Sequence, residues 1–245
     1  MKKISFYAGC LFIAASLLLE TSSCTSKSEN ASVQNATQPA ANEIDIAELE
    51  NDNPLTSLKK GNERFASGNS LHLHQDSIRI KELTAGQNPK AVIIGCSDSR
   101  VSPEILFDQG MGDLFVIRTA GNVMSDYELG SIEYATEHLH TKLIVVMGHY
   151  GCGAIHAMLE HVNDKNIPGH IANIVECLKE EQEEQDAIKS SNNLSVDAVK
   201  ANVIHGVKQL KDSDPILKES YEKGEIEIVG AIYHLDTGTV DFLES

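Results

Sequence analysis

The sequence is short of positive charge, of cysteine and of long hydrophobic runs, and each shortage excludes a class of protein. Only 20 lysine and arginine residues stand against 36 acidic residues, which gives a net charge of −16. A nucleic acid is therefore not expected as a partner, and neither is an anionic membrane surface. Five irregularly spaced cysteines are too few for a disulfide-stapled scaffold. Function must therefore be sought in local groups of residues.

A largely apolar run at the N-terminus predicts an export signal. Two lysines precede the apolar residues 4–19, a run that is too short for a comfortable membrane span. Small residues followed by Cys24 resemble the lipobox of bacterial lipoproteins, in which the cysteine is lipidated; ordinary cleavage nearby is the alternative. We expect residues 1–24 to be a signal peptide. The protein would then be exported, either periplasmic or anchored to a membrane through lipid on Cys24.

The rest of the chain divides into a tether and one domain. Residues 25–53 are rich in serine, asparagine, alanine, glutamine and acidic residues, and they cannot bury enough apolar surface to offset the entropy of ordering, so we expect a flexible tether. Residues 54–245 are long enough for one domain with a sizeable core. The domain begins with apolar residues at helical spacing in 54–68, which predicts an amphipathic helix.

Short apolar runs alternate with helical patterns through this domain. Strands separated by helices are typical of an α/β fold, here a mainly parallel β-sheet of four to five strands flanked by helices. The expected strands are 91–95, 114–118, 143–149, 226–235 and, after a turn, 240–242, and the expected helices are 131–140, 171–189 and 196–210.

Three metal-binding side chains fall at the predicted ends of two strands. Cys96 follows the first strand, His149 ends the third, and Cys152 lies three residues further on. Because the carboxyl ends of parallel strands meet at one edge of a sheet, these side chains are expected to lie close together. Two thiolates and an imidazole suit zinc, and three protein ligands leave a fourth position for chemistry. The sequence therefore predicts one catalytic zinc ion per chain.

The residues around these cysteines resemble a known family. CSDSR at 96–100, followed by HYGCGA at 149–154, is similar to the paired signature of β-class carbonic anhydrases. Further similar segments extend the resemblance from Pro54 to the C-terminus: LKKGNERF, GQNPKAVIIGCSDSR, DQGMGDLFVIRTAGN, GSIEYA and GAIYHLDTGTV. The resemblance implies reversible hydration of carbon dioxide to bicarbonate and a proton, by attack of zinc-bound hydroxide.

The resemblance also assigns roles to single residues. It implies that Cys96, His149 and Cys152 hold the zinc and that Asp98 and Arg100 form the catalytic dyad. Arg100 would keep the Asp98 carboxylate off the metal in an open state. In a closed state Asp98 would be the fourth ligand and would block turnover.

A second set of residues is implied to bind substrate. Gln87, Phe115, Ala120 and Tyr134 match positions that contact substrate or line the apolar pocket. Family members with an inhibitory bicarbonate site carry a tryptophan where this tryptophan-free chain has Ile93, so we expect no such site. The family also implies a homodimer or a dimer of dimers.

Two other functions are compatible with the same residues. Relatives with the same fold hydrolyse carbon disulfide or carbonyl sulfide, which are also small, linear and apolar. A protein of another class, a noncatalytic zinc or redox-thiol protein, would instead join Cys96 and Cys152 in a disulfide after export. A zinc-dependent nucleobase deaminase is excluded because the chain lacks the Pro-Cys-x-x-Cys and His-x-Glu motifs.

Overall fold

The computed structural model describes residues 51–163, 167–180 and 193–244. The chain divides into two units, Met1–Ile44 and Asp45–Ser245, and every described residue belongs to the second. The predicted signal peptide, Cys24 and nearly all of the predicted tether lie outside the described residues.

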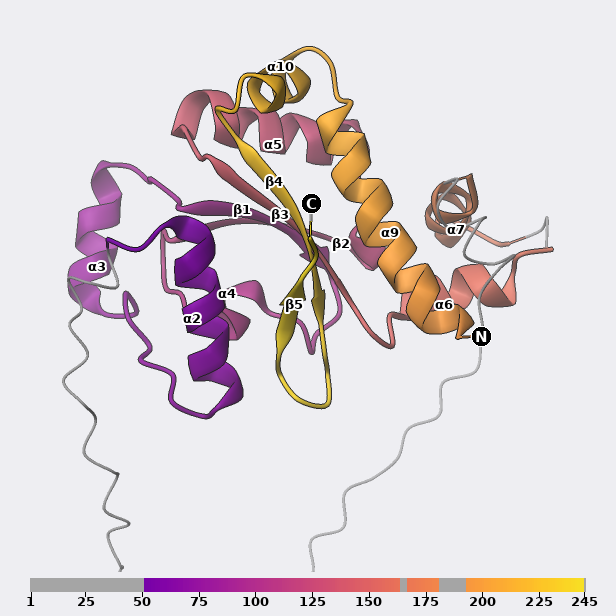
Figure 1. Cartoon of the computed structure of the whole chain (residues 1–245), viewed down its shortest axis with the longest axis horizontal. Helices are drawn as coiled ribbons and strands as arrows, with labels where there is room; N and C mark the ends of the chain where they lie inside the picture. The colour runs from indigo at the N-terminus through magenta and orange to yellow at the C-terminus, as the bar shows by residue number, and fades with distance from the viewer. Residues whose placement is uncertain (1–50, 164–166, 181–192, 245) are drawn as a thin grey trace, which may run out of the picture. The chain divides into compact units, whose positions relative to one another are not determined.

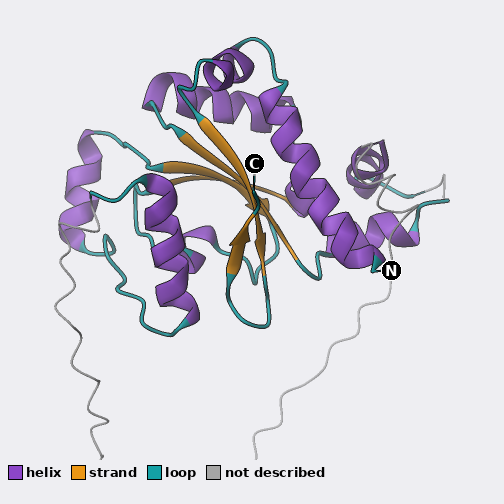
Figure 2. Ribbon diagram, viewed as in Figure 1, coloured by secondary structure: helices purple, strands orange, loops and turns teal. Residues whose placement is uncertain are grey.

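A five-stranded sheet with the order β2-β1-β3-β4-β5 forms the centre of the domain (Figures 1 and 2). Its first four strands in that order run parallel, and β5 pairs antiparallel with β4. This confirms the predicted α/β fold. The strands are β1 (Ala91–Cys96), β2 (Leu114–Thr119), β3 (Leu143–His149), β4 (Glu227–Tyr233) and β5 (Val240–Phe242).

Strands β1 and β3 are apolar up to the residues that end them, Cys96 and His149, and helices cover both faces of the sheet. Every residue of β1 and of β3 is buried. Such continuous apolar runs are typical of parallel strands with two covered faces. The alternation of apolar and polar residues that would mark a one-sided sheet is accordingly absent from these two strands.

Different helices cover the two faces (Figure 1). On one face the core includes Val146, Ile155 and Val199, and on the other it includes Leu58 and Phe107. The first face is covered by α5 (Asp126–Leu139), α6 (Gly153–Glu160), α7 (Ile171–Glu180), α9 (Leu194–Lys211) and α10 (Ile216–Glu222), and the second by α2 (Pro54–Ala66) and α4 (Pro103–Leu106). Helix α3 (Ser77–Glu82) and two 3₁₀ turns, η1 (Leu83–Ala85) and η2 (Ala120–Asn122), complete the fold.

Helix boundaries differ from the predicted ones in places that have a local cause. Helix α5 begins five residues before the predicted start at 131, because Ser125 and Glu128 form a capping box there. Helices α3, α4, α6 and α10 have four to eight residues, too few for a clear apolar period in sequence. The predicted helix at 171–189 is observed as α7 to Glu180, and its remainder, 181–189, lies outside the described residues.

Two buried aspartates fasten the segment before α3 to the loop before β2. The Asp108 carboxylate accepts hydrogen bonds from the backbone N–H groups of Leu71, at 2.9 Å, and His72, at 3.1 Å. It also pairs with Arg64 Nε at 2.6 Å. These contacts satisfy the buried carboxylate from within the protein.

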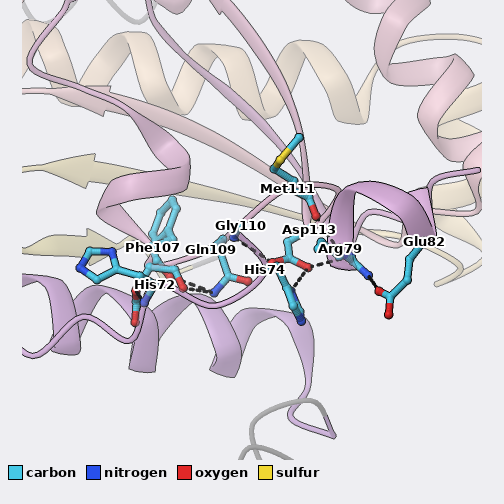
Figure 3. A network of polar contacts seen from close by, with 10 residues as sticks. His72, His74, Arg79, Glu82, Phe107, Gln109, Gly110, Met111 and Asp113 are labelled. Atoms are coloured by element: carbon cyan, nitrogen blue, oxygen red, sulfur yellow. Dashed lines mark hydrogen bonds and ion pairs between the residues drawn. The ribbon is translucent and has the colours of Figure 1, made fainter. Parts of the chain in front are cut away.

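The second aspartate, Asp113, is satisfied in the same way (Figure 3). It accepts the backbone N–H of Gly110 at 2.8 Å, lies 2.7 Å from Nδ1 of His74, and is 3.4 Å from Nη2 of Arg79. Asp113 directly precedes β2, so these contacts lie at the amino ends of the strands. We call the contacts of both carboxylates the Asp108–Asp113 network.

Among the described residues, none of the helices combines the length and the apolar character needed to cross a membrane.

Candidate metal centre

The parallel sheet brings Cys96, His149 and Cys152 together in a group that we call the metal cluster, or simply the cluster. Cys96 is the last residue of β1, and His149 is the last residue of the neighbouring strand β3. The chain then turns through Gly151, whose φ of 69° lies in the left-handed region that favours glycine, and delivers Cys152 to the start of α6. One potential ligand atom from each of the three side chains lies within 4.8 Å of the others, and all three residues are buried.

The imidazole of His149 is oriented as a metal ligand. Its Nδ1 lies 3.0 Å from the carbonyl oxygen of Tyr150, and because a carbonyl can only accept, Nδ1 must carry the proton. Nε2 then presents a lone pair. Within the part of the chain that the structure describes, Nε2 is buried and has no hydrogen-bond partner. A buried polar atom left in this state requires an explanation, and a cation held between the imidazole and the two sulfurs supplies one.

The two thiols also favour a cation. Their sulfur atoms are 3.9 Å apart. The contact with Cys152 lowers the pKa of Cys96 despite burial, and the same contact, with burial, raises the pKa of Cys152. The contact thus favours a thiolate at Cys96 and disfavours one at Cys152, and a divalent ion between the sulfurs would favour thiolates at both. Two thiolates with one imidazole fit zinc.

Beside the cluster, Asp98 and Arg100 form a bidentate ion pair. Arg100 Nε donates to Oδ1 of Asp98 at 2.9 Å, and Nη2 donates to Oδ2 at 2.6 Å. The guanidinium holds the pKa of the Asp98 carboxyl well below its usual range. Asp98 Oδ2 is nevertheless only 3.8 Å from Nε2 of His149. The carboxylate thus lies next to the cluster while its oxygens are engaged by Arg100.

Sequence reasoning missed Arg118. Its Nε donates to the carbonyl oxygen of Cys96 at 3.0 Å, and its Nη2 donates to that of Asp98 at 2.7 Å. This side chain from β2 therefore holds the backbone that carries both a thiol and the dyad carboxylate. A charged residue near the end of an apolar run was the available signal, and it does not specify a contact.

The four predicted substrate residues are divided between the two ends of the sheet. Ala120 follows Thr119, the β2 partner of Cys96, and so lies at the edge that carries the cluster. Phe115 pairs with Val92, about 13 Å back along the strand from Cys96. Its ring contacts that of Tyr134, with centroids 6.4 Å apart.

Gln87 is exposed and precedes β1, again at the opposite end from Cys96. The structure therefore does not bring Gln87, Phe115 or Tyr134 to the cluster of their own chain. Their predicted contact with substrate stays a prediction.

Comparison with known proteins agrees with this arrangement. The family described as "Carbonic anhydrase" matches residues 91–240, which include the whole cluster and the dyad. The chain belongs to the carbonic anhydrase family. Carbonic anhydrase 2 of Mycobacterium tuberculosis is 42% identical over 196 residues, covering 78% of this chain and 93% of the relative. The carbonic anhydrase of Mycolicibacterium smegmatis is 42% identical over 199 residues, covering 79% and 95%.

Solved structures place the chain in the β class of carbonic anhydrases. The β-carbonic anhydrase CcaA superposes with a TM-score of 0.62 at 27% identity, covering 78% of this chain and 95% of that one. A Coccomyxa β-carbonic anhydrase in complex with acetazolamide gives 0.60 at 30% identity, covering 77% and 84%. Zinc is the cofactor of this class, and the set of Cys96, His149 and Cys152 can hold one ion.

One further solved relative bears on assembly. A β-carbonic anhydrase of Sordaria macrospora, described as tetrameric, superposes with a TM-score of 0.61 at 25% identity, covering 79% of this chain and 98% of that one. This is consistent with oligomerisation of β-carbonic anhydrases.

Proposed function

We propose that this protein catalyses the reversible hydration of carbon dioxide to bicarbonate and a proton, with one zinc ion held by Cys96, His149 and Cys152. The observation that carries the proposal is the buried Nε2 of His149, which lacks a hydrogen-bond partner in the described residues and lies within 4.8 Å of two thiol sulfurs. Family membership supports the same reaction.

The residues of the chain divide the work of the reaction. When bound, zinc lowers the pKa of a water molecule so that a nucleophile is available near neutral pH. Asp98 accepts the remaining proton of that nucleophile in a hydrogen bond, which aims an oxygen lone pair at the carbon of carbon dioxide. As the new C–O bond forms, the π electrons of one C=O bond of carbon dioxide move onto its oxygen, which gives bicarbonate, and the proton lost from water passes to solvent.

Arg100 controls which state the site adopts. Its two contacts hold the Asp98 carboxylate beside the cluster, at 2.9 and 2.6 Å, in the arrangement of the open state. Breaking these contacts would free Asp98 to become the fourth ligand and to block turnover. Arg118 limits this movement, because it holds the Asp98 carbonyl at 2.7 Å.

The substrate pocket requires a second copy of the chain. Gln87, Phe115 and Tyr134 are at the far end of the sheet from their own cluster. We therefore propose a homodimer, alone or within a dimer of dimers, in which one chain supplies the metal ligands and its partner supplies these three residues.

Mixing two defective variants tests this proposal. Cys96→Ser retains an intact Gln87, and Gln87→Ala retains intact metal ligands. If the site is shared, exchange of subunits creates one complete site per heterodimer, and activity rises above that of either variant. Activity that stays at the average of the two variants would contradict a shared site.

The exported lipoprotein form is proposed from sequence alone. Basic residues, the apolar run and the small residues before Cys24 support it, and residues 25–53 would tether the enzyme to the membrane. Mass spectrometry of protein isolated from its native membrane tests this. The N-terminal fragment should carry diacylglycerol on Cys24, and a mature chain that begins elsewhere without lipid would contradict it.

A single set of measurements separates the proposed reaction from its alternatives. Stopped-flow carbon dioxide hydration is recorded across pH on protein of known zinc content, beside assays of sulfide release from carbon disulfide and carbonyl sulfide. We expect one zinc per chain, rapid hydration and little sulfide. Faster sulfide release would favour the hydrolase. The Cys96 and Cys152 sulfurs are 3.9 Å apart, close enough to be joined by a small movement. Protein isolated from its own compartment that contains this disulfide and no zinc would favour a redox protein.

A further inference from the structure

The sulfur of Cys96 accepts a hydrogen bond from a backbone group that has its own support. The N–H of Gly121 donates to Sγ of Cys96 at 3.4 Å. Gly121 lies in the η2 turn directly after β2, with φ 70° and ψ 20°, a conformation that favours glycine. A Cβ at this position would meet the Cβ of Ala154 at 2.9 Å. The contact with sulfur therefore depends on a tightly packed, left-handed residue.

A buried amide from a distant helix holds Gly121 in place. Nδ2 of Asn202, in the middle of α9, donates to the carbonyl oxygen of Gly121 at 2.9 Å. Oδ1 of Asn202 accepts a hydrogen bond from Nδ2 of Asn122 at 3.3 Å. Asn202 is 4% exposed, so its amide is removed from water and both of its ends are used inside the protein.

A buried asparagine at position 202 costs free energy of folding unless its amide is hydrogen-bonded. An asparagine at position 202 forgoes the burial of an apolar side chain on a helix that packs on the sheet through aliphatic residues such as Val199 and Val203. Burying an amide in such surroundings also costs free energy unless the amide is paired. Here the pairing is with the backbone that points at Cys96.

We infer that Asn202 is a positioning residue for the Cys96 ligand, acting through Gly121. The inference rests on the proposed zinc site. An N–H directed at a thiolate stabilises negative charge on the sulfur and reduces the charge that the sulfur donates to a bound cation. The cation is then a stronger Lewis acid than it would be if neither thiolate accepted a hydrogen bond. Asn202 thereby influences the metal without touching it.

The test compares two variants on one helix. Asn202→Leu removes the amide that holds Gly121, whereas Gln209→Leu removes an amide that donates to the Met124 carbonyl, at 3.3 Å, from the same helix to the same loop. The full chain is loaded with Co²⁺, and the thiolate-to-metal charge-transfer absorption is recorded. Zinc release from the zinc-loaded chain to a chelator is timed on the same variants.

In Asn202→Leu the charge-transfer band should move to longer wavelength, because Cys96 holds its electrons less tightly. Zinc release should be about 10-fold faster, because Gly121 no longer holds the Cys96 side chain in its position as a ligand. Gln209→Leu should leave both unchanged, although it also removes a hydrogen bond from α9 to this loop; Asn202→Leu removes two, the one to Gly121 and the one from Asn122. An unmoved band in Asn202→Leu, or equal shifts in the two variants, would overturn the inference. Both readouts report the metal–sulfur bond and not turnover. The inference about Asn202 can therefore fail while the proposed hydration of carbon dioxide stands, and the proposed hydration can fail while the inference stands.

A measurement on the unaltered chain covers the case in which Asn202→Leu does not fold. With an NMR-active cadmium isotope in the site, the Gly121 amide proton should show scalar coupling to the metal across the hydrogen bond to Cys96. The side-chain amide protons of Asn202 should be protected from exchange with solvent. Lack of the coupling, or rapid exchange of the Asn202 amide, would overturn the inference.

Discussion

The metal cluster and the Asp108–Asp113 network are both groups of buried polar side chains, but they differ in how their polar atoms are satisfied. In the network, each carboxylate faces backbone N–H donors and a basic side chain. In the cluster, Nε2 of His149 has no partner among the described residues. The network is complete within the protein, whereas the cluster becomes complete when a cation binds.

This difference separates a structural group from a functional one. The network contains aspartates and a histidine, which are common metal ligands, so residue types alone would not exclude it as a site. Its opposite charges already neutralise one another, at 2.6 Å between Arg64 and Asp108. The cluster instead combines an imidazole nitrogen that has no partner among the described residues with two thiols whose contact lowers the pKa of Cys96 and raises that of Cys152. A divalent ion would satisfy the nitrogen and favour the thiolate form of both cysteines.

The largest expected effect comes from removing the unpaired group itself. His149→Ala should abolish stoichiometric zinc binding and reduce carbon dioxide hydration by more than about 100-fold, since two thiols cannot form the site alone. Metal analysis and stopped-flow hydration check this, with circular dichroism as the control for folding. If His149→Ala retained one zinc and its activity, the unpaired nitrogen of His149 would no longer distinguish the cluster as a metal site from the Asp108–Asp113 network.

A smaller loss of activity, with zinc retained, is expected from Asp98→Asn. The amide keeps the shape of the side chain but loses the carboxylate that accepts the proton of the nucleophile. Hydration should fall by about 100-fold. Zinc content should equal that of the unaltered protein. Unchanged turnover in a zinc-loaded Asp98→Asn protein would contradict the role given to the dyad.

In the network, Asp108→Asn should affect stability and leave the metal site unaltered. Asparagine tolerates the φ of 47° at this position, so the backbone is preserved while Arg64 loses its buried partner. The free energy of unfolding should fall by about 3 kcal/mol, measured by urea denaturation. Zinc content and hydration per folded molecule are the controls. A loss of zinc in this variant would show that the two regions are coupled.

The smallest effect is a pH dependence of the Asp98–Arg100 pair. Arg100 lowers the pKa of Asp98, so the stability that the pair contributes is present above the unfolded value of about 3.9 and is lost as pH falls through the lower folded value. The free energy of unfolding in urea is measured for the zinc-free chain and for zinc-free Arg100→Gln, and the difference between the two should be constant above this pH range. The difference should shrink at more acidic pH, and one that grows there would contradict the assigned contact.

Prediction from sequence succeeded where the evidence was local. Cys96 and His149 could be placed together because each ends an apolar run, and parallel strands end at one edge. Arg118 was missed because its contacts with Cys96 and Asp98 depend on how far a side chain reaches across from the neighbouring strand. The resemblance supplied Gln87, Phe115 and Tyr134 but did not place them relative to the cluster.

The sequence alone determined the strands, their covered faces and the three candidate metal-binding residues, because apolar runs and residue chemistry are properties of short segments. Tertiary structure decided which polar atoms are satisfied. Asn202 meets Gly121 across 81 residues, and Arg118 meets Cys96 across 22, only because strands and helices pack at particular distances. Such long-range hydrogen bonds have no periodic signal in the chain, so the support of Cys96 becomes visible only in the folded protein.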